Sequence, residues 1–312
     1  MNILVVGASG YVGRHIVEQA HRRGHRVRAV VRDKARAESA GAWGAPSLAD
    51  RVDEWVVGDV TDRSLTAGVC DGVDAVISAL GVTRQKADPW DIDYRANLNI
   101  LESARAHDVT RFCYVNAIHA ESIRSQLTRA KTAFAQALIQ SPLAHQVVSP
   151  SGYFSDMSAI AQMARRGRVY LLRPQGRLNP IHGADVAAYC LDKVESAQEG
   201  SYDIGGPEVL SWREVAQYAF EAVGRPAKIT VIPPRLADGV VKVIGLIKPR
   251  VADTLSFMLW SLTRYTDLEK IYEELDYSKE VFKKYRAHVI NITDKSIEET
   301  AFLIEDHLKK LR

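Results

Sequence analysis

The chain has few cysteines, and their spacing is not that of a metal site. Its 312 residues include three of them, Cys70, Cys113 and Cys190, which lie far apart in the sequence. A small and odd number of cysteines is typical of proteins in a reducing cytosol, where buried thiols stay free. No Ser-His-Asp or Cys-His arrangement stands out either. We therefore predict neither a metal centre nor a hydrolase.

The chain also lacks a long apolar run and a large net charge. No run reaches the ~20 apolar residues that span a bilayer. The nearest stretch, residues 236–263, is interrupted by charged side chains, namely Asp238, Lys242, Lys248, Arg250 and Asp253. A net charge of +3 favours neither nucleic acid nor an anionic membrane as a partner. Because a strand-like run opens the chain directly, we expect no targeting peptide and a cytoplasmic protein without a transmembrane segment.

What the chain does have is a glycine-rich turn between an apolar run and a helix. Residues 2–6 read as a buried strand, and Gly7, Gly10 and Gly13 follow. In a dinucleotide-binding fold the first glycine permits the tight turn, the second lets the backbone approach the pyrophosphate, and the third lets the helix pack close to the strand. The N-terminus of the helix binds the pyrophosphate. The alternative is an ordinary βα turn. The position of the glycines, directly after a strand and before a helix, favours dinucleotide binding. The residues predicted to line this cradle are Gly7, Ser9, Gly10, Tyr11, Val12 and Gly13.

The end of the second predicted strand selects between the two nicotinamide cofactors. Residues 26–31 form this strand, and Arg32, Asp33 and Lys34 follow it. An acid here bonds the ribose 2′-hydroxyl of NAD, whereas a basic residue pairs with the 2′-phosphate of NADP. Arg32 offers a planar fork that matches phosphate, with Lys34 as a second charge, and Asp33 is the competing observation. We predict NADP, the alternative being that Arg32 is a solvated surface residue.

Further apolar runs alternate with helical segments along the first half of the chain. The predicted strands are residues 54–58, 73–78, 111–115 and 146–148, with helices over 92–106 and 127–138. Repeated βαβ units with continuous apolar strands predict an α/β fold, a doubly wound parallel sheet of Rossmann type. Ligands of such sheets bind at the carboxyl ends of the strands. The residues expected there, beside the cofactor, are Asp59, Val60, Ala79, Leu80 and Gly81.

The regular alternation loosens after residue 154. The predicted elements are a strand over 169–172, a helix over 184–194, strands over 202–204 and 228–232, and helices that begin with capping boxes at Ser211 and Ser296. We assign residues 1–154 to an NADP-binding Rossmann core and residues 155–312 to a smaller, mostly helical substrate-binding region and tail, interleaved with the core. The apolar side chains of 236–263 need cover. One alternative is that these side chains pack on the protein's own core. The other is that they form a lid, which admits a hydrophobic substrate or contacts a membrane surface.

A series of motifs runs in the same order as in one known family. They are residues 7–13 and 58–62, Asp93-Tyr94 with Asn97-Leu98-Asn99, Ala130-Lys131, and residues 149–154, 179–187 and 203–208. This pattern resembles the atypical short-chain dehydrogenase/reductases, the branch with NmrA-like, isoflavone-reductase-like and divinyl-chlorophyllide-reductase-like members. The resemblance covers roughly residues 1–234 and implies a Rossmann fold that binds NADP. It identifies the superfamily without identifying a substrate.

The chain departs from that superfamily at the usual proton donor. The main short-chain dehydrogenases carry a tyrosine four residues before the lysine, and here Leu127 precedes Lys131. Leucine cannot donate a proton. Asn116 stands where serine or threonine is usual, and Asp93 stands where extended members often carry asparagine. Isoflavone-reductase-like relatives also work without that tyrosine, so its absence does not exclude catalysis.

Three residues are the candidates for catalysis. The resemblance implies that Lys131 bonds the nicotinamide ribose, the alternative being a solvated helix lysine. Tyr153 follows Pro150 and Gly152 at the end of the sixth strand, where we expect all three beside the nicotinamide. The Tyr153 phenol either donates a proton or lines the pocket. Asn116 either orients a carbonyl or ends its strand.

Three other polar residues have simpler explanations. His119 titrates near neutrality, yet a surface loop histidine is the more common case. His182 and Asp185 look structural, because Asp185 can cap the helix that follows.

Two functions fit these residues. The first is an NADP-dependent reductase, in which the cofactor passes a hydride to an unidentified, hydrophobic small molecule. The second is a non-enzymatic NADP-binding regulator or assembly subunit, which the missing tyrosine favours. The sequence leaves the substrate, the proton donor and the oligomeric state open.

Overall fold

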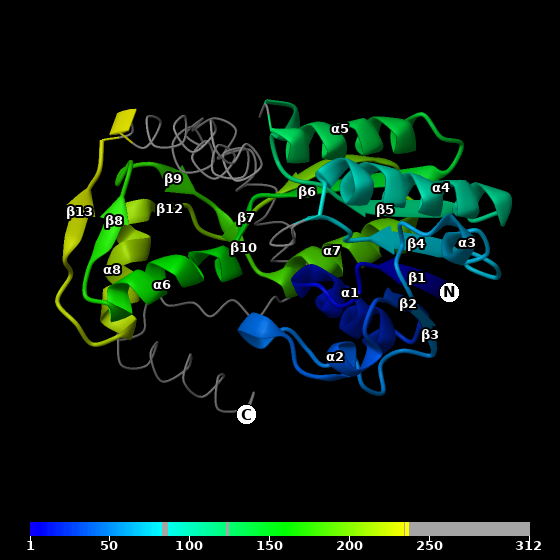
Figure 1. Ribbon diagram of the computed structural model, residues 1–312, viewed down its shortest axis with the longest axis horizontal. Helices are drawn as coiled ribbons and strands as arrows, with labels where there is room; N and C mark the ends of the chain where they lie inside the picture. The colour runs from blue at the N-terminus through cyan, green and yellow to red at the C-terminus, as the bar shows by residue number, and fades with distance from the viewer. Residues whose placement is uncertain (83–86, 123–124, 234, 237–312) are drawn as a thin grey trace. The chain divides into compact units, whose positions relative to one another are not determined.

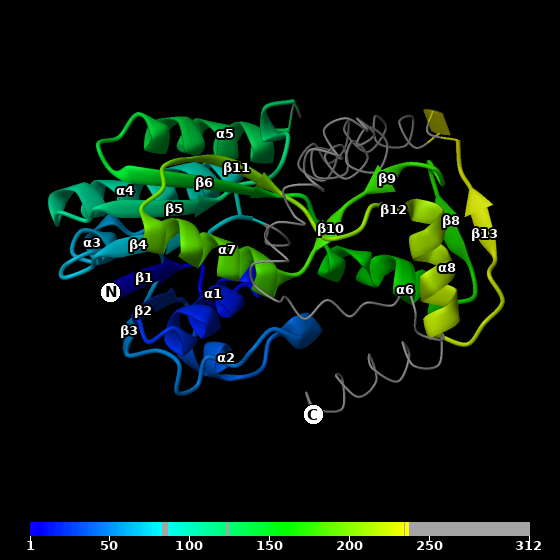
Figure 2. The same ribbon diagram turned by 180° about the vertical axis from the view of Figure 1, so that it is seen from behind.

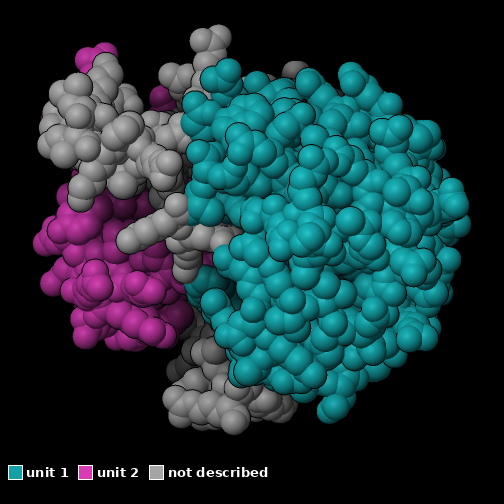
Figure 3. All heavy atoms as spheres, turned by 45° about the vertical axis from the view of Figure 1, so that its right-hand side comes forward, with its two compact units in different colours: residues 1–150, 183–204 teal, residues 151–182, 205–312 magenta. Residues whose placement is uncertain are grey.

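The computed structural model describes residues 1–82, 87–122, 125–233 and 235–236. The chain divides into two compact units, which Figure 3 shows in different colours. Unit 1 comprises Met1–Pro150 and Gly183–Ile204, and unit 2 comprises Ser151–His182 together with the chain from Gly205 onward. The chain therefore leaves unit 1 at Pro150 and returns to it before unit 2 is completed.

Unit 1 is built on a seven-stranded sheet in the order β11-β6-β5-β4-β1-β2-β3 (Figure 1). Every neighbouring pair is parallel. The strands are β1 (Asn2–Val6), β2 (Arg26–Val31), β3 (Glu54–Val57), β4 (Ala75–Ser78), β5 (Arg111–Val115), β6 (Ala144–Pro150) and β11 (Gly200–Ile204). The strand order reverses between β1 and β4, and ligands of open parallel sheets bind outside the carboxyl ends of strands at such a reversal. The predicted Rossmann-type doubly wound sheet is confirmed.

Helices cover both faces of this sheet. They are α1 (Tyr11–Arg22), α2 (Lys34–Glu38), α3 (Arg63–Thr66), α4 (Asn97–Ala106), α5 (Gln126–Ile139) and α7 (Gly183–Ser196). Figures 1 and 2 show α4 and α5 on one face and α1 and α7 on the other. Four residues of β1, Ile3–Val6, are fully buried, as expected for a strand with both faces covered. Phe112, Phe134 and Leu138 fill the core beneath α4 and α5.

The seventh strand comes from a part of the chain that the sequence placed after the core. We predicted a strand over 202–204 in a second region interleaved with the core, and the strand β11 pairs in parallel with β6, from Gly200 beside Gln146 to Ile204 beside Pro150. The helix α7 packs against α1 and leads into β11. Unit 1 therefore contains two segments of the chain.

Unit 2 has a small core of its own. Its elements are β7 (Gly152–Tyr153), α6 (Ser158–Arg165), β8 (Val169–Leu171), β9 (Arg177–Leu178), β10 (Pro180–Ile181), β12 (Leu210–Ser211), α8 (Trp212–Ala222) and β13 (Ile229–Val231). The strands form three short pairs, β10 with β7, β12 with β9 and β13 with β8. Val169, Ala216 and Phe220 lie in the core between α6, α8 and β8. The predicted capping box of α8 is confirmed, since Ser211 and Glu214 hydrogen-bond each other's backbone N–H groups.

Two predictions fall outside the described residues. They are the lid or membrane contact proposed for 236–263 and the helix expected to begin at Ser296. Within the described part of the chain, no helix has the length and apolar character needed to cross a membrane.

Candidate cofactor site

The glycine-rich turn joins β1 to α1 at the point where the strand order reverses. Gly7 adopts a φ of +75°, which side chains disfavour. A Cβ atom on Gly7 would lie 2.8 Å from the Ala79 carbonyl oxygen, and one on Gly13 would overlap the carbonyl oxygen of Gly7. Both glycines are therefore required by packing within the protein, as the sequence predicted for Gly13.

Gly10 differs from its two neighbours because the protein leaves space beside it. It is the N-cap of α1, with an extended φ of −75°, and a Cβ there would meet only the Gly7 carbonyl oxygen, at 3.2 Å. No side chain caps α1, and its first turn holds no acidic residue. The open N–H groups of a helix N-terminus bind anions. The turn therefore fits the pyrophosphate of a dinucleotide.

Arg14 fixes the segment that follows β2, a role that the sequence analysis missed. Its buried guanidinium donates hydrogen bonds to backbone carbonyl oxygens of Ser9, Arg36, Ala37, Ser39 and Pro46, at 2.7–3.0 Å. Burial lowers the Arg14 pKa, and the nearby Arg36 lowers it further. Gly41 leaves room for this side chain, because a Cβ there would lie 2.7 Å from the Arg14 Cδ. Arg14 thereby ties the turn to the residues beside Arg32.

Trp43 is a second residue near the turn that the sequence did not single out. It adopts a left-handed φ of 54°, which is unusual for a bulky residue. Its side chain is 42% exposed, and its ring lies edge-on to that of Tyr11, with 6.3 Å between the centroids. The Tyr11 hydroxyl in turn accepts a hydrogen bond from the backbone of Gly183 at 3.2 Å. The cradle residue Tyr11 is thus held between α7 and an exposed indole.

The predicted basic residues after β2 have different surroundings. Arg32 is exposed and lies close enough to Asp59 to contribute to lowering its pKa, after the hydrogen bonds from Thr61. Asp33 is the N-cap of α2, where its carboxylate accepts a hydrogen bond from the Arg36 N–H at 3.0 Å. Lys34 lies over the Trp55 ring, 5.5 Å from its centroid, and its Nζ is 3.7 Å from Glu38. The pairing of Arg32 with a 2′-phosphate stays a prediction.

The turns after β3 and β4 lie at the same edge of the sheet as the glycine turn. Asp59 accepts hydrogen bonds from the backbone N–H and the hydroxyl of Thr61, at 2.9 and 2.8 Å. Val60 is buried, and Leu80 packs against the same core cluster. The backbone N–H of Ala79 donates to the Val6 carbonyl at 3.0 Å. These residues occupy the positions that the sequence predicted, while their contact with a cofactor stays a prediction.

Lys131 lies within α5 and reaches the turn after β4. Its Nζ is 3.1 Å from Asp93 Oδ1, and the two side chains are 13% and 0% exposed. A Cβ on Gly81 would lie 3.0 Å from the Lys131 Nζ. Leu127 precedes it by one turn of the same helix. Lys131 is therefore not a solvated surface lysine, and no phenol stands before it on α5.

Tyr114 on β5 is near Lys131 but does not replace the missing tyrosine. The Lys131 Nζ lies 5.4 Å from the centroid of the Tyr114 ring. The side chain is fully buried against Phe134, and burial raises its pKa to about 12. A phenol that has no access to solvent and holds its proton this tightly is a poor general acid at neutral pH.

Asn116 carries an unsatisfied buried oxygen at the end of β5. Its backbone N–H donates to the Val148 carbonyl at 2.8 Å, while its Oδ1 is buried without a hydrogen-bond partner. Such atoms are uncommon in folded proteins and often mark a binding or catalytic position. The Oδ1 can accept a hydrogen bond but cannot bind a carbonyl oxygen, so the predicted role of Asn116 in orienting a carbonyl stays a prediction. His119, three residues on, adopts a left-handed φ of 52°.

The remaining predicted residues lie where the chain passes from unit 1 into unit 2. Pro150 ends β6 in unit 1, whereas Gly152 and Tyr153 form β7 in unit 2 and pair with Pro180 and Ile181. Because Tyr153 and Lys131 belong to different units, their joint role stays a prediction. Asp185 lies within the first turn of α7 and not at its N-cap, and burial raises its pKa to about 6.

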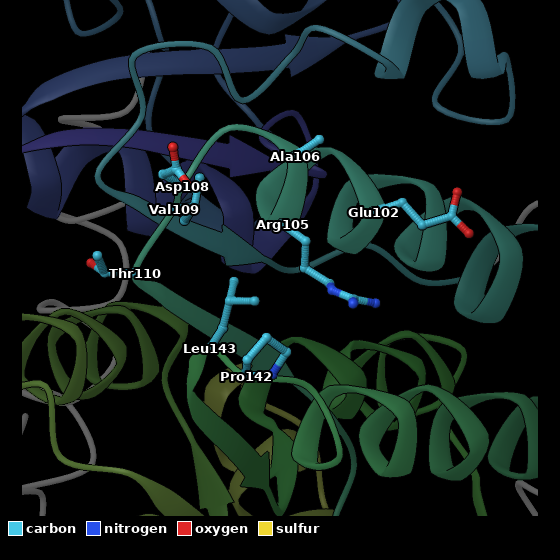
Figure 4. Close-up of a pocket in the computed structure, with 8 residues that line it drawn as sticks. All are labelled: Glu102, Arg105, Ala106, Asp108, Val109, Thr110, Pro142 and Leu143. Carbon is cyan, nitrogen blue, oxygen red and sulfur yellow. The ribbon is translucent and has the colours of Figure 1, made fainter.

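One hollow of unit 1 lies away from these residues. It has a volume of about 710 Å³ and lies between the end of α4 and the starts of β5 and β6 (Figure 4). Its lining includes Glu102, Arg105, Asp108, Pro142 and Leu143. Because it lies at the amino ends of the strands, it is not part of the cofactor site. Among the described residues no group of three or more potential metal ligands is found.

Comparison with known proteins agrees with this geometry. The family described as NAD(P)H-binding matches residues 7–197. The chain belongs to this family. Together with the relatives below, it confirms the resemblance to the atypical short-chain dehydrogenase/reductases. A solved NADPH-dependent quinone oxidoreductase, QOR2 of Escherichia coli in complex with NADPH, superposes with a TM-score of 0.68 at 17% identity, covering 91% of this chain and 99% of that one. At that identity the likeness concerns the fold alone.

Two relatives of this NAD(P)H-binding chain extend over most of its length. The divinyl chlorophyllide a 8-vinyl-reductase of Zea mays is 31% identical, over 82% of this chain and 68% of that protein. The photosystem II assembly factor Ycf39 of Trieres chinensis is 23% identical, over 93% of this chain and 88% of that protein. One relative is named for a reduction and the other for an assembly role.

The end of the chain matches a different family, which the sequence analysis did not identify. The family described as kinase/pyrophosphorylase matches residues 226–304. A Streptococcus sanguinis protein, named as a pyruvate, phosphate dikinase regulatory protein, is 70% identical over 82 residues, which are 26% of this chain and 30% of that protein. The chain thus spans less than a third of that relative. The match begins before β13, so it overlaps the last strand that the structure describes.

Proposed function

We propose that the chain is an NADP-dependent reductase that acts on an apolar small molecule. The observation that carries this proposal is one group of contacts at the reversal of the strand order. The glycine turn packs on the turn after β4 at Gly7 and Ala79, and the same turn meets the Lys131 ammonium at Gly81. The glycine turn and the largely buried Lys131 ammonium thus both contact the turn after β4 in unit 1, which supports a single site for the pyrophosphate and the nicotinamide ribose. The maize relative, named for the reduction of a vinyl group, supports a substrate with a carbon–carbon double bond.

Each residue has a separate task in this proposal. The N–H groups at the start of α1 bind the pyrophosphate, Arg32 binds the 2′-phosphate, and Lys131 bonds the nicotinamide ribose. Bound NADPH supplies the hydride, and the protein supplies position and electrostatics. Asn116 Oδ1 is available to orient an N–H or O–H donor of a bound group. Tyr153 remains the predicted proton donor or pocket wall.

Replacing Lys131 by alanine is expected to reduce substrate-dependent NADPH oxidation by roughly 100-fold, because a misplaced cofactor loses the reacting geometry. The measurement is the decrease in NADPH absorbance with a set of apolar vinyl and quinone compounds. Arg129→Ala is the matched control, since Arg129 is exposed on the same helix. If Lys131→Ala and Arg129→Ala oxidise NADPH equally well, Lys131 has no part in the reaction.

Replacing Arg32 by alanine is expected to weaken NADP binding roughly ten- to a hundredfold and to leave NAD binding unchanged. The reason is the loss of a charge-assisted contact to the 2′-phosphate, worth about 1.5–3 kcal/mol. Fluorescence titration of both cofactors against wild type and variant measures the ratio. Equal affinity of the wild type for NADP and NAD would contradict the choice of cofactor.

A second function is a non-enzymatic NADP-binding regulator or assembly subunit. Leu127 in place of the proton donor and the Ycf39 relative support it. The same oxidation screen separates the two functions, since a regulator binds NADPH tightly and turns over none of the compounds. The match of residues 226–304 adds a relative that is named as a regulatory protein. Because the match covers only 30% of that relative, we do not assign its activity to this chain.

A further inference from the structure

Besides its ion pair with Lys131, Asp93 accepts hydrogen bonds from the backbone of Val82 and from the side chain of Asn97. Its Oδ2 accepts a hydrogen bond from the backbone N–H of Val82 at 3.0 Å. Its own carbonyl accepts one from the Asn97 side chain at 3.0 Å, and Asn97 accepts one from the Ser78 hydroxyl at 2.6 Å. The Asp93 carboxylate is therefore bonded to the turn after β4, and the Asp93 backbone is linked through Asn97 to Ser78 at the end of β4.

The backbone that presents Asp93 is itself unusual. Residues Trp90–Ala96 form a π-helix that runs directly into α4. Single turns of π-helix are rare and occur frequently at functional sites. Gly81 completes the arrangement, because a Cβ there would lie 2.9 Å from Asp93 Oδ1. The fold thus leaves room for a carboxylate and an ammonium beside the turn after β4.

The charges around Lys131 show what Asp93 does. Burial alone would lower the Lys131 pKa, but the neighbouring Tyr114 and Asp93 outweigh burial and raise it above its ordinary value. The groups that face Lys131 among the described residues are Asp93 from the π-helix and Tyr114 from β5, while the turn after β4 presents Gly81, which has no side chain. Burial raises the Asp93 pKa, while the Lys131 ammonium and the Val82 N–H oppose that rise. Since burial raises the Tyr114 pKa to about 12, the Asp93 carboxyl, and not the phenol, is the group that can compensate Lys131 at neutral pH.

We propose that Asp93 is the positioning residue of the cofactor site, which keeps Lys131 protonated and directs its ammonium to the turn after β4. The inference rests on the proposed function, because it gives Lys131 the nicotinamide ribose as its ligand. A lone buried lysine would lose its proton near neutral pH. A neutral amine is a weaker donor to a ribose hydroxyl than an ammonium. The aspartate therefore extends the pH range over which the cofactor is bound.

The first experiment follows the protonation of Lys131 with no cofactor present. Lysine labelled with ¹³C at Cε reports the titration of each amine by NMR, and Lys131→Arg identifies the signal. In the wild type, Lys131 is expected to titrate above Lys34, which is exposed and serves as the internal reference. In Asp93→Asn, which keeps the volume and removes the charge, its midpoint is expected to fall to about pH 9 or lower, because burial is then no longer offset by the carboxylate.

Two outcomes of this titration overturn the proposal. One is a Lys131 midpoint that does not move in Asp93→Asn. The other is a wild-type Lys131 midpoint at or below that of Lys34. This comparison does not use the Asp93→Asn variant, so it remains decisive if that variant does not fold.

The second experiment measures NADPH affinity between about pH 7 and pH 9.5, a range below the ordinary lysine pKa. Wild-type affinity is expected to stay constant. Affinity of Asp93→Asn is expected to fall about tenfold across the range, with the midpoint seen by NMR, whereas Asp93→Asn with Lys131→Met shows no pH dependence. A purely structural role of Asp93 would not create this transition. If the lysine titrates as expected and affinity does not follow it, Asp93 does not position Lys131 for the cofactor. If the wild type binds no NADPH at all, the failure belongs to the proposed function, because the lysine titration reports on Asp93 without it.

Discussion

Replacing Gly10 by valine is expected to abolish NADPH binding while the protein stays folded. A side chain at this position would place its Cβ 3.2 Å from the Gly7 carbonyl oxygen, a close contact that a shift of a few tenths of an ångström relieves, and the φ of −75° suits any residue. The pyrophosphate does not accommodate it, because the second glycine of such turns lies where the backbone approaches the phosphates. A loss of more than about 100-fold, or about 2.7 kcal/mol, is expected by fluorescence titration.

Gly13→Ala is the contrasting variant for this prediction. A Cβ at Gly13 overlaps the carbonyl oxygen of Gly7, which is backbone and cannot turn aside. Gly13→Ala is therefore expected to lose folding along with binding, as seen in the thermal melt, whereas Gly10→Val loses binding alone. A folded Gly10→Val protein with wild-type affinity for NADPH would show that the glycine turn is not the pyrophosphate site.

Replacing Arg14 by methionine is expected to lower the stability of the protein strongly. Methionine keeps the apolar volume but leaves five backbone carbonyl oxygens without the guanidinium. Hydrogen bonds to a charged group contribute about 1.5–3 kcal/mol each, and water replaces some of them, so a total of about 3 kcal/mol or more is expected. That corresponds to a decrease in melting temperature of about 6 °C or more.

Arg22→Met is the matched control for Arg14, because Arg22 lies on the same helix and is exposed. It is expected to leave the melting temperature within about 1 °C, as surface substitutions usually do. NADP affinity should fall in Arg14→Met, since residues 36–46 lose their tie to the glycine turn. If the Arg14→Met protein is as stable as the Arg22→Met protein, Arg14 does not hold residues 36–46 in place.

Local patterns in the sequence were sufficient for the parallel sheet and the glycine turn. β2 and β5 begin and end at the predicted residues, and β1 likewise spans Asn2–Val6. Strands buried on both faces are continuous apolar runs, and glycine has no substitute in a turn this tight. Such features depend on a few neighbouring residues, so a single sequence shows them.

The contacts that define the site join residues that are far apart in the sequence. The sequence alone did not reveal these contacts. Asp93 and Lys131 are 38 positions apart, and the sequence analysis noted Asp93 only as a departure from the usual asparagine. Arg14 follows the glycine turn and looks like any helix arginine until Ser39 and Pro46 are folded against it. The membership of β11 in the main sheet depends on its pairing with β6, which no local pattern encodes.

The position of β11 has a consequence for the order of events during synthesis. The sheet of unit 1 is complete only when Ile204 has left the ribosome, after the whole of residues 151–182 has been made. Chains grow at about 5–20 residues per second, so β6 waits for several seconds with an unpaired edge. An open, apolar strand edge is a template for pairing with other chains. While the chain between β6 and β11 is being made, the nascent protein is therefore exposed to pairing with other chains at this edge.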